Sequence, residues 1–190
     1  MLLLRRLGIA LLILTPAASP SHAGWFELGL RSDAVQASAG RHLGSDPQGR
    51  FAIGGRGLWN DNHDTKLGAF VARFEAERTS VQGLEFAIGV DVFLGKGENL
   101  DVGAAAIGIQ ASMAPPAWRG GFVGARVAYA PGIFTWSDTE RLFEGSVRAG
   151  WRATPRIAVF VEYQKIRADF DGAGNRDLDD TLKAGFGGRF

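Results

Sequence analysis

The sequence of 190 residues contains no cysteine and only three histidines. Without cysteine the chain forms no disulfide framework and no thiolate metal site. Its charge is nearly balanced, with 21 basic and 20 acidic residues. A nucleic-acid interface needs a clustered excess of basic residues, so nucleic acid is not an expected partner.

Long apolar segments are also missing after residue 23, where no run approaches 18 residues, and this excludes a helical membrane protein. The apolar run at residues 7–15 follows two arginines and precedes a small-x-small sequence at residues 21–23. This pattern predicts a signal peptide, residues 1–23, that is cleaved on export. The mature chain, residues 24–190, then has 190 − 23 = 167 residues, which suits a single domain.

Period-two alternation of apolar and polar residues dominates the mature chain, and residues 84–94 show it most clearly. In this stretch Glu85 and Asp91 lie on the face opposite a row of Leu, Phe, Ile and Val. An unpaired charge is costly in the core of a soluble sandwich, whereas a transmembrane β-barrel faces lipid with apolar residues and has a polar interior. A soluble lipocalin-like barrel would need the opposite arrangement. Barrel closure also pairs every strand with two neighbours, which replaces the missing disulfides.

The alternating segments predict an all-β fold, an antiparallel transmembrane β-barrel of ten strands, because bacterial single-chain barrels have even strand numbers. Eight strands remain the alternative if the first two segments do not pair separately. Both termini are expected in the periplasm, with longer extracellular loops at residues 60–66, 131–140 and 169–180. The expected strands are residues 25–31, 35–43, 51–59, 67–75, 84–94, 100–113, 121–129, 143–152, 157–164 and 181–190.

The tryptophans fall near the ends of the expected strands, as an aromatic girdle at the membrane boundary requires. They are Trp25, Trp59, Trp118, Trp136 and Trp151.

The C-terminal segment alternates up to a terminal phenylalanine, with Leu182, Ala184, Phe186 and Phe190 on one face. It resembles the C-terminal signal of bacterial outer-membrane barrels, although Gly188 stands where a bulky residue is usual. The resemblance implies that Phe186 and Phe190 form an assembly signal read by the barrel-assembly machinery.

Three short motifs resemble the YfaZ family of outer-membrane barrels. They are the small-residue strand at residues 102–108, the Pro155-Arg156 connection and the Gly174-Asn-Arg-Asp177 segment before the last strand. The resemblance implies a small, porin-like barrel in the outer membrane and brings no catalytic residues.

Charged residues on the inward faces of the strands are the candidate functional residues. If residues 154–156 form a whole turn, Glu162 faces Arg148 across the ladder within salt-bridge reach. Two interpretations stay open: paired charges plug the interior, or they line a narrow solute path. The set comprises Arg56, Arg73, Glu85, Asp91, Arg126, Glu144, Arg148, Arg152, Glu162 and Lys183.

Two loops suggest other chemistry. The acidic stretch at residues 169–180 has Asp and Gly spacing like that of a calcium loop, but a solvated turn is the preferred interpretation. In the stretch at residues 61–64, His63 lies among acids and amides, which suggests an outer-membrane hydrolase as an alternative.

The sequence therefore predicts a small, non-enzymatic outer-membrane barrel with no cofactor and no metal. Its expected partners are outer-membrane lipid, lipopolysaccharide and the barrel-assembly machinery.

Overall fold

The computed structural model describes residues 24–46, 49–76 and 81–190, and the predicted signal peptide lies outside these residues. The described chain is almost entirely β-structure, with two 3-10 turns, η2 (Pro116–Trp118) and η3 (Gly132–Phe134). The strands are β1 (Gly24–Leu30), β2 (Ala34–Asp46), β3 (Gly49–Asn60), β4 (Thr65–Ala76), β5 (Leu84–Gly97), β6 (Leu100–Met113), β7 (Gly121–Ala130), β8 (Thr135–Ser137), β9 (Thr139–Arg152), β10 (Ile157–Phe170) and β11 (Gly174–Arg189). No helix in this part of the chain is long and apolar enough to cross a membrane.

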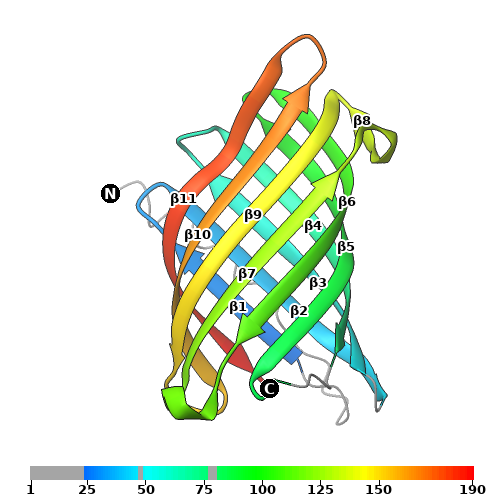
Figure 1. Cartoon of the computed structure of the whole chain (residues 1–190). Coiled ribbons are helices and arrows are strands. Elements are labelled where there is room, and N and C mark those ends of the chain that lie inside the picture. The colour runs from blue at the N-terminus through cyan, green and yellow to red at the C-terminus, as the bar shows by residue number, and fades with distance from the viewer. Residues whose placement is uncertain (1–23, 47–48, 77–80) are drawn as a thin grey trace.

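Ten strands form a closed antiparallel ring in the order β1-β2-β3-β4-β5-β6-β7-β9-β10-β11 (Figure 1). The ring closes where β11 pairs with β1, with Leu28 opposite Phe186. The remaining strand, β8, has three residues and pairs only with β6. The prediction of a ten-stranded barrel is confirmed, and the alternative of eight strands is wrong.

The first described residue and the last residue of the chain meet at one end of the barrel. The Gly24 amide donates to the Phe190 carbonyl at 2.7 Å, and the Phe190 amide donates to the Gly24 carbonyl at 2.9 Å. We call this the terminal end. At the opposite end the β10–β11 hairpin extends beyond the rim, so we call it the hairpin end.

Large apolar side chains cover the outside of the wall, whereas charged side chains turn inward. Leu182 and Ile109 are 60% and 61% exposed, while Lys183, beside Leu182 in sequence, is 1% exposed. This is the reverse of a soluble barrel and is the arrangement that a surrounding bilayer stabilises. Towards the hairpin end the apolar wall stops at outward charged residues, namely Lys66, Lys96, Asp101, Arg141, Lys165 and Asp180.

The prediction of a long loop at residues 169–180 is wrong. β10 continues to Phe170 and β11 already begins at Gly174. Ile166 pairs with Asp179 and Arg167 with Asp177, so Leu178 is an extra residue that forms a β-bulge. The bulge breaks the alternation, and therefore Leu178 and Asp179 are both completely buried.

Aromatic rings fill the interior near the terminal end by lying over glycines. A Cβ atom on Gly40 would come within 2.7 Å of the Trp25 ring, and one on Gly54 within 3.1 Å. Trp25 therefore points inward and does not belong to the expected girdle. The other four tryptophans are exposed, by 41% to 56%.

Gly185 illustrates how tightly these rings are packed. A Cβ atom there would lie 2.4 Å from the Leu28 carbonyl oxygen and 2.6 Å from the Phe160 ring, whereas one on Gly57 would meet nothing within 4 Å. Gly185→Ala should therefore destabilise the barrel by about 1–3 kcal/mol through overpacking. Gly57→Ala, the matched strand control, should be neutral or slightly stabilising. Urea unfolding in lipid vesicles measures both, and equal midpoints would contradict the packing described here.

Candidate functional site

Glu144 is the centre of the polar interior and is completely buried. The Arg56 Nη2 donates to its Oε2 at 2.9 Å, and the Gln164 Nε2 donates to its Oε1 at 2.7 Å. The Arg126 Nε lies 3.5 Å from the same carboxylate, and Arg126 also forms an ion pair with buried Asp91. The carboxylate thus joins two cations and an amide in one network.

The Arg56–Glu144 pair crosses the whole barrel. In the ring, β3 and β9 are five positions apart through β2, β1, β11 and β10, so they lie on opposite walls. Arg56 also lies over the Phe93 ring, with 5.4 Å between the guanidinium carbon and the ring centroid. The pair therefore occupies the middle of the lumen, the space that the strands enclose.

Arg148 organises a second group, towards the terminal end. It donates to both Glu27 oxygens at 2.7 and 3.1 Å and to Glu162 at 2.8 Å. Glu162 is the direct cross-strand partner of Arg148, which confirms the register derived from the sequence. The Arg148 guanidinium also lies 4.5 Å from the centroid of the Phe160 ring. The ion pairs of Arg148 and the Phe160 ring together fill this part of the lumen.

Lys183 organises a third group, and its side chain is 1% exposed. Its Nζ lies 2.5 Å from Asp179, 2.6 Å from Gln164 and 3.3 Å from Gln36. The Asn60 side-chain Nδ2 donates to the Asp179 Oδ1 at 2.6 Å. A buried ammonium is costly without such partners, and here its three donors each find an oxygen.

An apolar layer closes the lumen towards the hairpin end. A Cβ atom on Gly97 would lie 2.2 Å from the Leu178 Cδ2, so Leu178 of β11 reaches the wall at β5, five positions away in the ring. The layer consists of buried residues from several strands: Leu58, Leu67, Ala69, Phe93, Val102, Ala104, Ala106, Ala128, Ala130, Leu142, Ile166, Ala168, Phe170 and Leu178.

The other three charges of the predicted set lie nearer the terminal end. The Arg73 Nη1 donates to Gln110 at 2.9 Å. Glu85 is exposed and accepts from Ser112 at 3.2 Å. Arg152 is also exposed, with its guanidinium 5.9 Å from the Phe122 ring centroid. A narrow void near Arg73 does not admit a water-sized sphere.

Sequence reasoning missed several polar partners of the network, among them Glu27, Gln36, Gln164 and Asp179. Glu27, Gln36 and Gln164 lie on the polar face of an expected strand, so the alternation of apolar and polar residues could have identified them as inward-facing. Asp179 was assigned to a loop, because the bulge at Leu178 breaks the alternation that would have predicted its inward position.

A rim cluster at the terminal ends of β2, β3 and β4 contains one histidine. Glu75 accepts from the Arg50 Nε at 2.6 Å and lies 3.2 Å from the His42 Nε2. The other histidine among the described residues, His63, lies in the hairpin-end turn between β3 and β4. Its carbonyl accepts a hydrogen bond from the Thr65 hydroxyl at 3.1 Å. No group of three or more His, Asp or Glu able to hold a metal occurs among the described residues.

Four of the five aspartates of the supposed calcium loop, residues 169–180, belong instead to the β10–β11 ladder, and Asp171 lies in the turn between the two strands. Arg167 donates to Asp177 at 2.8 Å, and the Lys165 Nζ lies 3.0 Å from Asp180. These residues lie beyond the apolar wall, whose last outward member on β10 is Tyr163. The bond from Arg167 lowers the pKa of Asp177, and bonds from Tyr163 and Lys165 lower that of Asp180. They act as ion-pair partners between strands.

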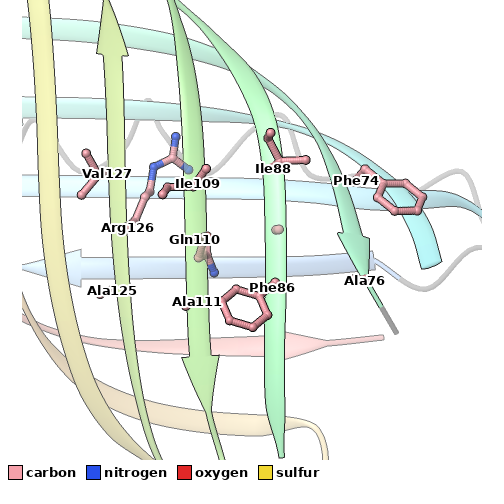
Figure 2. A pocket seen from close by; sticks show the side chains of 11 residues that line it. Phe74, Ala76, Phe86, Ile88, Ile109, Gln110, Ala111, Ala125, Arg126 and Val127 are labelled. Carbon is pink, nitrogen blue, oxygen red and sulfur yellow. The ribbon is translucent and has the colours of Figure 1, made fainter. Parts of the chain in front are cut away.

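One hollow of the described structure opens on the lipid-facing wall. It is a furrow of about 390 Å³ across β4, β5, β6 and β7. Figure 2 shows Phe86 beside the small residue Ala111, with Phe74 on β4 and Ala125 on β7 at opposite sides of the hollow. Its lining is mainly apolar and includes the outward residues Phe74, Phe86 and Ile109, so most of the hollow faces the lipid.

The closed ring and its outward apolar wall define the protein as a transmembrane β-barrel. No protein-family model and no curated protein matches the chain, so the resemblance to the YfaZ family stays a prediction. Among solved structures the chain is similar to the "KdgM porin in complex with disordered oligogalacturonate", with a TM-score of 0.48, 8% identity, and coverage of 88% of this chain and 99% of that chain. A likeness of this degree carries no information about a bound solute.

Glu144→Ala should leave Arg56 and Arg126 buried without their shared partner. Loss of one side of a buried pair costs about 3–5 kcal/mol. The control is Glu98→Ala, whose carboxylate is 42% exposed and 3.4 Å from Arg176, and its cost should be at most about 1 kcal/mol. Urea unfolding in vesicles compares them, and a Glu144 variant as stable as the control would contradict the central role of this carboxylate.

The hairpin beyond the wall should loosen in acid. Asp177 and Asp180 have folded pKa values below the ordinary 3.8, so their pairing contributes stability above that pH and loses it as the pH falls through the lower folded values. Amide-exchange protection of residues 165–180, corrected for intrinsic rates, should fall only below about pH 4. Asp177→Asn should weaken protection at neutral pH, and an unchanged profile would argue against these pairs.

Proposed function

We propose that the protein is a closed, non-enzymatic structural barrel of the outer membrane. One observation carries the proposal: the interior contains contacts between opposite walls at two levels. Arg56 binds Glu144 across the middle of the lumen, and Leu178 reaches Gly97 nearer the hairpin end. A solute would have to break a buried ion pair and displace a packed apolar layer, and both steps are costly.

Placement in the outer membrane is part of this proposal. It is supported by the signal-like sequence at residues 1–23 and by the barrel architecture, which spans membranes with every backbone group paired. The terminal end would then face the periplasm and the hairpin end the exterior. Phe186 and Phe190, outward-facing and 42% and 58% exposed, are proposed as the signal for the assembly machinery. Lipopolysaccharide is the proposed lipid partner of the outer leaflet.

Membership of the YfaZ family is proposed from the three short motifs that resemble it in sequence. The motifs that carry it lie in β6, in the β9–β10 turn and at the start of β11. A family of small barrels agrees with a closed interior, since ten strands leave little space beyond that of side chains.

The closed barrel predicts silence in a planar bilayer. Refolded protein, checked by heat-modifiable migration in gels, should show no discrete conductance steps. A variant without the wall-to-wall contacts, Arg56→Ala with Glu144→Ala and Leu178→Ala, should conduct because the central obstruction is gone. Leu182→Ala, an outward truncation on the same strand as Leu178, serves as the control and should stay silent.

Discrete steps in the unmodified, folded protein would refute the closed barrel and favour a narrow path lined by the inward charges. A silent triple variant that still folds would place the obstruction elsewhere, and the proposal in this form would fail.

A further inference from the structure

The segment between β7 and β9 differs from the other connections at the hairpin end because it presents apolar side chains outward. Residues 131–137 carry no charge. Within this segment Ile133 is 83% exposed, Phe134 43% and Trp136 41%. Contact of such residues with water is unfavourable, so their exposure needs a physical reason.

The segment leaves the wall at the height of the apolar belt. Tyr129 of β7 pairs with Ile107 of β6, and further along β6 Ala104 pairs with Thr135 of β8. Residues 131–134 therefore protrude between these two heights. Figure 1 shows this excursion projecting sideways from the barrel next to β8, away from the lumen.

The charged boundary of the wall lies further towards the hairpin end. On β6 the first outward charge is Asp101, and its cross-strand partner on β5 is Lys96. Trp136 pairs with Gly103, and its indole lies where a Cβ of Gly103 would point, 2.2 Å from that position. Gly103 lies two residues from Asp101, towards the apolar wall. Trp136 therefore lies on the membrane side of the charged boundary.

We infer that η3 and β8 form a membrane anchor, with Ile133 and Phe134 inserted among the acyl chains of the leaflet at the hairpin end. Trp136 lies above them at the headgroup level, where amphipathic aromatic rings are favoured. The occupant of this surface is lipid, because the apolar residues continue the lipid-facing wall of Tyr129 and Ile107, which are 46% and 53% exposed. The anchor would limit vertical motion of the barrel in the bilayer.

The absence of cysteine permits a clean test with single labelled sites. Ile133→Cys carries an environment-sensitive fluorophore. Ile107→Cys, on the apolar wall, is the lipid-exposed reference, and Asp171→Cys, at the exposed tip of the β10–β11 turn, is the aqueous reference. Each protein is refolded into phosphatidylcholine vesicles, and heat-modifiable migration confirms its fold. Iodide quenches probes in water, and lipid-attached nitroxide quenches probes in the bilayer.

The probe at residue 133 should resemble that at residue 107. Its emission should be blue-shifted, its iodide quenching constant severalfold smaller than at residue 171, and its nitroxide quenching strong. Iodide quenching equal to that at residue 171 would overturn the anchor. Protection from both quenchers that increases with the protein-to-lipid ratio would overturn it too, because a second copy would then cover the segment.

A label-free variant gives an independent readout. Ile133→Asp should lower the urea midpoint both in vesicles and in detergent micelles, because a charge is costly among acyl chains. Asp171→Asn is the control and should change neither value. Equal stability of Ile133→Asp and the unmodified protein in vesicles would contradict insertion.

Discussion

Glu144 lies between Arg56 of the opposite wall and Arg126 of the neighbouring strand, and the interior of the barrel depends on this carboxylate. Both arginines are nearly buried, with 11% and 9% of their side chains exposed. Loss of the Glu144 carboxylate would leave Arg56 as an uncompensated buried charge, which is strongly destabilising. Because the strands that carry these groups are held by continuous ladders, the ion pair and the ring closure support each other.

The rest of the interior is divided by chemistry along the barrel axis. Aromatic rings over glycines occupy the terminal end, the three ionic groups of Glu144, Arg148 and Lys183 occupy the middle, and an apolar layer occupies the hairpin end. At each level, side chains from different strands contact one another. Charges in the middle are shielded from lipid by the wall, and the apolar layer behind them limits access of water from the hairpin end.

The apolar and charged residues of the outer surface indicate where the bilayer surrounds the barrel. Its apolar face ends at a set of outward charges on six strands, and the ion pairs of Lys165 and Arg167 with Asp177 and Asp180 continue the β10–β11 ladder beyond that limit. The β7–β9 connection is different, since Ile133 and Phe134 stay on the apolar side. Two neighbouring connections of one barrel thus face water and lipid respectively.

The barrel class, the strand number and the pairing of Glu162 with Arg148 could be read from the sequence, because period-two alternation and short turns are local properties. Local pattern failed at Leu178, where a bulge reverses the alternation and hides Asp179. Nearness to a strand end wrongly assigned Trp25 to the girdle, although its alternation with outward Leu28 places it inside, over Gly40 and Gly54. The Arg56–Glu144 contact joins residues 88 apart. Only closure of the ring determines which strands face each other across the lumen, so tertiary structure alone decided which side chains meet between opposite walls.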